Sequence, residues 1–149
     1  MMSQQGAIQE PADRLQARSQ SACFVCGPDN PHGLHIGFER RDSGELTATW
    51  TPRPTWEGFQ GIVHGGIVST VLDEAMSKAV AASGAKAFTA EIRVRFRRHV
   101  ITGEAYQIRG WILKRNKRLI ETEAMLTAPD GTEHAHAWAN FLTLPRVNG

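Results

Sequence analysis

The chain has 149 residues, of which 41% are hydrophobic, 21% charged and 7% aromatic, and its formal net charge is only +2. This composition excludes disordered, collagen-like and disulfide-rich proteins, and the balanced charge gives no general attraction to nucleic acid. No apolar run reaches the roughly 18–20 residues of a membrane span, and the length fits one ordinary core. We therefore expect one globular domain over residues 21–149, with neither a membrane nor a nucleic acid as partner.

The N-terminal segment is polar and contains no apolar signal-peptide core, which predicts a flexible leader over residues 1–20 and a cytoplasmic protein. The only two cysteines, Cys23 and Cys26, are expected to be reduced in that compartment. Together with His32 and His35 they could be read as four zinc ligands. Their spacing is unusual for zinc, however, so we expect no metal site.

Two short strands are predicted before the middle of the chain. Residues 34–41 and 45–51 flank Asp42-Ser43-Gly44, which is typical of a hairpin turn. The prolines of the segment 51–56 (TPRPTW) lack the N–H groups that a central strand needs. The second strand is therefore predicted to end there.

A buried helix is predicted from His64 to about Ala82, because the segment is rich in Ala, Leu and Val around most of its circumference. Gly84 is a plausible C-terminal cap. The helix has one polar strip, at offsets of four, three and four residues, formed by Gly66, Thr70, Asp73 and Ser77.

Four strand-like segments follow, over residues 88–100, 104–113, 118–127 and 132–144, with the last three joined by turns of hairpin length. In the last segment three alanines share a face with Phe141, which would allow a helix to approach the sheet closely. Two strands, one buried helix and four antiparallel strands indicate an α+β fold in which a curved sheet wraps around the central helix.

The start of the predicted helix carries the densest chemical signal, the segment GIVHGG from Gly61 to Gly66, followed by Asp73. Glycines let a substrate approach the backbone, and the first N–H groups of a helix have no intrahelical partner, so they suit a developing oxyanion. A carboxylate on an apolar helix is costly unless it has a partner or a task. We expect burial to raise the pKa of Asp73, with Thr70 and Ser77 as donors that could oppose the rise.

These residues resemble a known family. The segment GFQGIVHGGIVSTVLDEAM is similar to the signature of hotdog-fold acyl-CoA thioesterases, the group that includes the phenylacetate-pathway and 4-hydroxybenzoyl-CoA enzymes. The segment CFVCGPDNPHGL resembles one found in uncharacterised bacterial members, and the predicted strand order matches that fold over residues 34–144. The resemblance implies hydrolysis of an acyl-CoA to a free acid and coenzyme A, without a metal or redox cofactor. It also implies a homodimer, or a dimer of dimers, with sites across the dimer interface.

The resemblance also implies roles for particular residues. Asp73 would be the general base or the nucleophile, and the Gly65 N–H would hold the oxyanion, assisted by Gly66. His64 would position the thioester or support the loop. Thr89 matches the position at which relatives place a hydroxyl that contacts substrate or water, although a purely structural hydroxyl is an equal alternative.

One position departs from the family pattern. Relatives often carry Asn or Gln six residues before the histidine, where this chain has Gly58. Glu57 and Gln60 are the neighbouring candidates for that role. Acyl specificity is expected to depend on pocket depth, set by residues such as Phe59, Met76, Phe88 and Trp111.

A basic stripe is predicted on the strand 88–100, where Arg93, Arg95 and Arg97 alternate with apolar residues. A solvated strand face is the simpler interpretation; the functional one is that Arg97 and its neighbours bind the coenzyme A phosphates. His134 and His136 could bind a metal, but we favour an ordinary exposed or interface pair.

Two other functions fit the same fold. A non-catalytic protein could bind or sense acyl-CoA in the same pocket, and ligand-induced stabilisation without thiol release would favour it. A dehydratase or hydratase acting on acyl thioesters ranks last, because the chain shows none of the motifs typical of those enzymes.

Overall fold

The computed structural model describes residues 22–145. The chain separates between His35 and Ile36 into two compact units. The predicted leader over residues 1–20 lies outside the described residues, and the prediction of one domain over residues 21–149 stays a prediction. Within residues 22–145, no helix is both long and apolar enough to cross a membrane.

The described part of the first unit is a tight loop held by its own backbone. Gly27 N–H donates to the carbonyl of Cys23 at 2.8 Å, and Leu34 N–H donates to the carbonyl of Phe24 at 2.8 Å. Gly33 has no room for a side chain, because a Cβ there would lie 2.7 Å from the Phe24 oxygen. The loop is therefore closed on itself at both ends.

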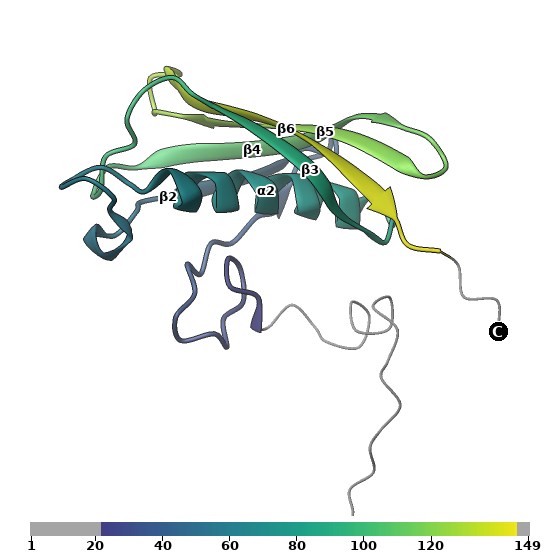
Figure 1. The fold of residues 1–149 in the computed structure, drawn as a ribbon, viewed down its shortest axis with the longest axis horizontal. Helices are drawn as coiled ribbons and strands as arrows, with labels where there is room; N and C mark the ends of the chain where they lie inside the picture. Colours follow the sequence, from purple (N-terminus) through teal and green to yellow (C-terminus); the bar gives the residue numbers. More distant parts are fainter. Residues whose placement is uncertain (1–21, 146–149) are drawn as a thin grey trace, which may run out of the picture. The chain divides into compact units, whose positions relative to one another are not determined.

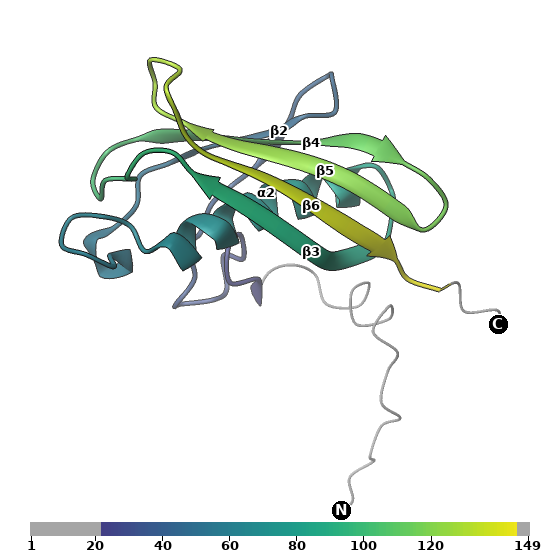
Figure 2. The ribbon, with the colours of Figure 1, turned by 45° about the horizontal axis from the view of Figure 1, so that its top comes forward.

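Within residues 36–145, the second unit contains one long helix and six strands. Their bounds are β1 Glu39–Arg40, β2 Leu46–Trp50, α2 Gly65–Ala82, β3 Ala87–Phe96, β4 Tyr106–Arg115, β5 Leu119–Thr127 and β6 Glu133–Thr143, with the 3-10 turn η2 Pro54–Trp56 before the helix. All paired strands are antiparallel, and the sheet order is β1-β2-β4-β5-β6-β3. Figure 1 shows α2 running along one face of this sheet, and Figure 2 shows the strands side by side across it. The predicted α+β arrangement is confirmed.

Very small residues bring α2 close to the sheet. Ala135 and Ala137 are fully buried on the helix-facing side of β6, together with Phe141. On β4, a Cβ added to Gly110 would lie 2.6 Å from the backbone carbonyl of Ala75 in α2. The helix therefore rests almost directly on the backbone of β4 at Gly110, and the close approach that the alanines of the last strand indicated is also seen on β4.

The helix itself follows the sequence closely. It begins at Gly65 and ends at Ala82, and Gly84 has the positive φ of 87° that a helix-terminating glycine adopts. Its buried side chains form the core with the sheet: Val68, Val71, Leu72, Ala75, Met76, Ala79 and Val80.

Two of the predicted strands differ most from the structure, and β4 is shifted by two residues from its predicted range of 104–113. The first strand was expected over residues 34–41, yet β1 pairs over two residues only; His35 has a left-handed φ of 53°, which interrupts the extended backbone. The strand predicted to reach Val100 ends at Phe96. There the N–H groups of Arg97 and Arg98 both donate to the His134 carbonyl, so the chain turns out of the ladder.

Candidate active site

The loop that precedes α2 is held rigidly by short hydrogen bonds. Gly58 N–H donates to the Ile62 carbonyl at 2.8 Å, and His64 N–H donates to the Trp56 carbonyl at 2.9 Å. The Glu57 carboxylate accepts from Gly61 N–H at 2.9 Å, and Gly61 has a φ of 75° that favours glycine. These bonds fix the direction in which the helix begins.

His64 is the N-cap of α2. Its Nδ1 accepts a hydrogen bond from Gly66 N–H at 2.9 Å, and its carbonyl accepts from Ile67 N–H at 2.9 Å. A ring nitrogen that accepts carries no proton, so a neutral His64 has its proton on Nε2 and can donate from there. The Gly66 N–H, expected to assist an oxyanion, is instead used within the cap.

Gly65 occupies the first helical position beside this cap. Among the described residues, its N–H has no hydrogen-bond acceptor, as is usual for the first donors of a helix. A Cβ at Gly65 would lie 3.4 Å from Cζ of Phe96, so the phenyl ring lies against the start of the helix. A Cβ at Gly58 would lie 3.3 Å from Cα of His64. The free donor is therefore bordered by an aromatic ring, and Gly58 is the tighter position, where an added Cβ would press on the His64 backbone.

Asp73 lies half-buried two turns further along α2. The Thr89 hydroxyl of β3 donates to its Oδ1 at 2.7 Å, and among the described residues no hydrogen bond reaches Oδ2. Burial raises the pKa of the Asp73 carboxyl above its ordinary value of 3.8, and the hydrogen bond from Thr89 partly opposes that rise. Oδ1 is thus held in place by Thr89, and Oδ2 is available to accept a proton or to act as a nucleophile.

The donor to Asp73 is Thr89 rather than either of the two expected donors, Thr70 and Ser77. The Thr70 hydroxyl donates to the Gly66 carbonyl one turn earlier in the helix, at 2.8 Å, so it does not serve Asp73. Such a bond within the helix is a common alternative for Thr at this position. The predicted direction of the pKa change is confirmed, and its opposing hydrogen bond comes from β3.

A β-bulge brings Thr89 to this position. Thr89 is opposite Phe141, which faces the helix, whereas Glu91 is opposite Asn140, and the pairing shifts between them. In a regular strand Thr89 and Glu91 would project to the same side of the sheet. The extra residue, Ala90, reverses this alternation, so Thr89 faces the helix while Glu91 faces away.

Gly65 and Asp73 are well separated although both belong to α2. They are eight residues apart, which corresponds to roughly 12 Å along a helix axis that rises about 1.5 Å per residue. A thioester carbonyl is much shorter than this distance. A single carbonyl therefore cannot contact the Gly65 N–H and the Asp73 carboxylate of one chain at the same time.

The remaining candidate residues have structural partners or solvent around them. Glu57 braces the loop through Gly61, while Gln60 is exposed. Arg97 forms an ion pair with Glu133, with its Nε 3.4 Å from the carboxylate, and its side chain remains 46% exposed. Among the described residues, none of the three forms a recorded hydrogen bond or ion pair with Asp73 or Gly65.

The residues suggested for the acyl pocket are dispersed. Phe88 and Trp111 project from the sheet face opposite to α2, since their strand neighbours Thr89 and Gly110 face the helix. Met76 is fully buried in the core. The aromatic residue at the start of the helix is instead Phe96. Phe96 was not among the predicted site residues, although the alternation of apolar and charged residues in its strand indicated that it lies on the apolar face.

Neither of the two histidine pairs, His134 with His136 or His32 with His35, belongs to a metal-binding group among the described residues. His134 donates from Nδ1–H to the His99 carbonyl at 2.9 Å, whereas His136 lies between the carboxylates of Glu123 and Glu133 and stacks on Trp138. Within the described residues, His134 and His136 belong to no group of ligand atoms that could share an ion, and neither His32 nor His35 joins the cysteines in one.

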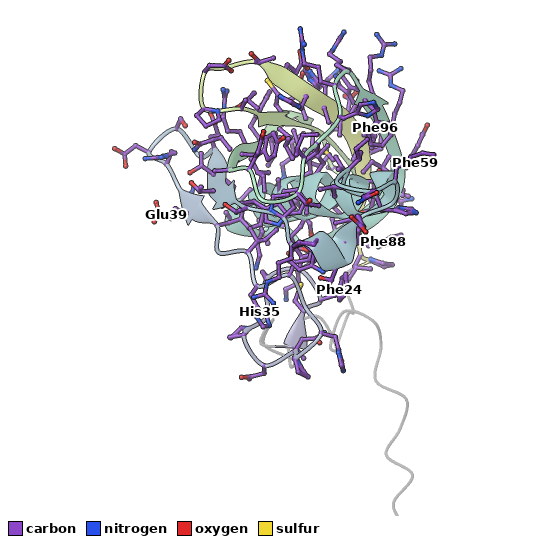
Figure 3. The ribbon with its side chains drawn as sticks, turned by 90° about the vertical axis from the view of Figure 1, so that its left-hand side faces the viewer. Phe24, His35, Glu39, Phe59, Phe88 and Phe96 are labelled. Atoms are coloured by element: carbon purple, nitrogen blue, oxygen red, sulfur yellow. The ribbon has the colours of Figure 1, made fainter. Side chains whose placement is uncertain are left out.

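The strand that carries Thr89 has an open edge. Among the described strands, β3 pairs with β6 alone, and three of its apolar side chains are exposed, Phe88 by 48%, Ile92 by 38% and Phe96 by 53%. Phe59, in the loop before α2, is 82% exposed. Figure 3 shows Phe59, Phe88 and Phe96 on the same side of the view. An unpaired edge with exposed aromatic residues is typical of a surface that another chain covers.

Comparison with known proteins now identifies the family. The family model described as the thioesterase superfamily matches residues 60–135, which is just over half of the chain and includes Gly65, Asp73 and Thr89. The chain belongs to the thioesterase superfamily. No curated relative matches the sequence of this superfamily member.

Solved structures of other thioesterase-superfamily chains share the fold. A protein described as a thioesterase superfamily protein is 26% identical with a TM-score of 0.76; the match covers 78% of this chain and 61% of that one. The E. coli PaaI protein from the phenylacetic acid degradation operon is 17% identical with a TM-score of 0.68, covering 73% and 83%. The curved antiparallel sheet with its single helix is the hotdog fold, as the sequence predicted.

A hypothetical thioesterase from Streptococcus pneumoniae, solved with coenzyme A, is 15% identical with a TM-score of 0.69, covering 74% of this chain and 87% of that one. Further structures of the pneumococcal protein carry alanine in place of an aspartate or of a threonine. The two replaced residues are sixteen positions apart in that protein. Asp73 and Thr89 have the same spacing here.

Proposed function

We propose that this superfamily member is an acyl-CoA thioesterase in which Asp73 is the general base or nucleophile. The observation that carries the proposal is the half-buried Asp73 carboxylate, with Oδ1 anchored by Thr89 and Oδ2 left available. A raised pKa makes the Asp73 carboxylate a stronger base. The proposed hydrolysis needs no metal or redox cofactor, and coenzyme A enters only as part of the substrate.

The reaction proceeds through a tetrahedral intermediate. Asp73 either removes a proton from a water that attacks the thioester carbon, or attacks that carbon itself to give an anhydride that water then hydrolyses. In both routes the carbonyl oxygen becomes negatively charged and accepts a hydrogen bond from the Gly65 N–H. Collapse of the intermediate breaks the C–S bond, and the coenzyme A thiolate leaves and takes up a proton.

His64 and Gly66 support this oxyanion site. The bond from Gly66 N–H to His64 Nδ1 holds the ring against the helix start, so His64 positions the loop and presents Nε2–H as a donor. Glu57 and Gln60 are proposed to act through the same loop, Glu57 by bracing Gly61. The lack of a side chain at Gly58 fits the close approach of the His64 backbone at that point.

The proposed enzyme is a homodimer with shared sites. Because Gly65 and Asp73 are roughly 12 Å apart on one helix, the Gly65 N–H of one chain must act with the Asp73 of another on the same carbonyl. The open edge of β3 and its exposed side chains Phe88, Ile92 and Phe96 supply the surface for that second copy. Two such dimers could associate further, but the dimer is the smallest active unit.

Coenzyme A is the proposed carrier of the acyl group. The pneumococcal relative was solved with coenzyme A, which supports this class of substrate. Arg97 is proposed to bind a coenzyme A phosphate, for which its planar guanidinium is suited. To do so it must share its charge with Glu133, its present partner.

The proposal is tested by thiol release from short, medium, long and aromatic acyl-CoA substrates. The wild-type protein should release coenzyme A from at least one class, whereas Asp73→Asn should lose at least about 100-fold in rate because an amide can neither accept the proton nor attack. Wild-type turnover by Asp73→Asn would overturn the assignment of the base. Stabilisation by acyl-CoA without any thiol release from the wild type would favour the non-catalytic binding protein instead.

A further inference from the structure

The Cys-x-x-Cys pair of the first unit has no part in the proposed hydrolysis. Cys23 and Cys26 are the only cysteines of the chain, and both are half-buried. Their sulfur atoms lie within 4.8 Å of each other, and Cys26 N–H donates to the Cys23 sulfur at 3.5 Å. The two thiols are thus neighbours on one turn, and both retain some exposure to solvent.

The loop holds this turn in place. Gly27 N–H donates to the Cys23 carbonyl at 2.8 Å, and Leu34 N–H closes the loop on the Phe24 carbonyl at 2.8 Å. The Asn30 side chain adds a bond from its Nδ2 to the Ala22 carbonyl at 3.3 Å. Residues three apart in a turn have Cα atoms within about 7 Å, which overlaps the range of about 4.4–6.8 Å found in disulfides. A side-chain rotation is then enough to bring the sulfurs together.

We propose that Cys23 and Cys26 are a reversible modification site, at which a low-molecular-weight disulfide such as oxidised glutathione converts the pair to an intramolecular disulfide. One cysteine thiolate attacks a glutathione sulfur, which forms a mixed disulfide and releases one glutathione thiolate. The second cysteine thiolate then attacks the bound protein sulfur and releases the other. The two thiol protons pass to the two glutathione molecules, so the protein is oxidised by two electrons and one glutathione disulfide is reduced.

Because the chain has only two cysteines, the product of this reaction can be assigned without ambiguity. With no third cysteine, the only disulfide possible within one chain joins Cys23 to Cys26. The experiment uses the full-length protein in buffers of reduced and oxidised glutathione, quenched with acid and then alkylated with iodoacetamide. Intact mass distinguishes free thiols, which become alkylated, from a disulfide, which is two hydrogens lighter and is not alkylated.

The expected result is loss of both alkylatable thiols in one transition, fully reversed by dithiothreitol. The folded protein should form the disulfide with an effective thiol concentration at least about tenfold above that of the urea-unfolded chain, because the loop holds the sulfurs together. Cys23→Ser and Cys26→Ser should each stop at a glutathione adduct. Asp73→Asn should oxidise like the wild type, because the modification is independent of the proposed hydrolysis.

Four results would overturn the proposal. Both thiols could remain alkylatable in oxidised glutathione alone, or the folded and unfolded chains could show equal effective concentrations. The disulfide could join two chains rather than one, as a non-reducing gel would show. Finally, one zinc ion per chain, lost in both serine variants and protecting the thiols from oxidation, would identify the pair as metal ligands.

Discussion

The Thr89 hydroxyl donates a 2.7 Å hydrogen bond to the Asp73 carboxylate and thereby links the edge strand β3 to the middle of the helix α2. Burial and this bond act in opposite directions on the pKa of Asp73: burial raises it, and Thr89 limits the rise. The bond also fixes which carboxylate oxygen faces β3. The pKa and the orientation of the Asp73 carboxylate therefore both depend on Thr89.

Replacing Thr89 with Ala should slow thioester hydrolysis by about 10- to 100-fold, since a hydrogen bond to a charged group is worth about 1.5–3 kcal/mol. Loss of the donor should also raise the pKa of Asp73, because that bond lowers it. The acidic limb of the kcat/KM profile should then move to higher pH. Thr89→Ser keeps a hydroxyl and should restore both rate and profile; an unshifted profile in Thr89→Ala would mean that the bond does not tune Asp73.

Asp73→Asn should change how stability depends on pH. The folded pKa of Asp73 lies above 3.8, so the native state binds its proton more tightly than the unfolded chain does. The wild type should therefore lose stability as the pH rises from about 3.8 through the folded pKa, and Asp73→Asn should lack this loss. In thermal melts at equal protein concentration, the Tm of Asp73→Asn should rise relative to the Tm of the wild type between pH 4 and 7. A constant difference over that interval would contradict the raised pKa.

Gly65→Pro offers a selective test of the oxyanion donor. Proline lacks an N–H but is well accepted at the first helical position, and His64 before it already has an extended ψ of 133°. We expect a loss of about 100- to 1,000-fold in kcat. Gly65→Ala is the matched control, because it keeps the N–H and places a Cβ equally close to Phe96. Equal losses in both variants would assign the effect to crowding rather than to the donor.

Mixed dimers test whether the two residues act across chains. A dimer of one Gly65→Pro chain and one Asp73→Asn chain would have one intact site and one site lacking both groups. We expect it to show about half of the wild-type activity, although each parent is inactive alone. Co-expression with two affinity tags isolates the mixed species. If both groups served the same carbonyl from one chain, the mixed dimer would stay inactive.

The helix and the order of the strands could be predicted from the sequence, because periodicity and turn residues report local structure directly. His64 to Ala82 and the glycine cap at Gly84 are examples. The acid was also predictable, since a carboxylate on an apolar helix needs a reason to be there. Its expected partners were Thr70 and Ser77, however, which helix periodicity places about one turn before and one turn after it.

The true partner depends on a feature that alternation alone does not reveal. Read as a regular strand, β3 places Thr89 with Glu91 on the face away from the helix; the bulge at Ala90 reverses this. Thr89 was proposed only through the family resemblance. The Gly110 contact with Ala75 was likewise not predicted, because it requires knowing which strand lies beneath the helix.

That contact at Gly110 has a mechanical consequence. At Gly110 no flexible side chain separates the helix from the sheet. A small tilt of α2 would therefore bring the backbone of Ala75 into collision with the backbone of β4. We therefore expect Asp73 to keep the same depth in the empty and the loaded protein. We then expect adaptation to acyl groups of different size at the edge strand β3, while the position of the Asp73 carboxylate stays the same.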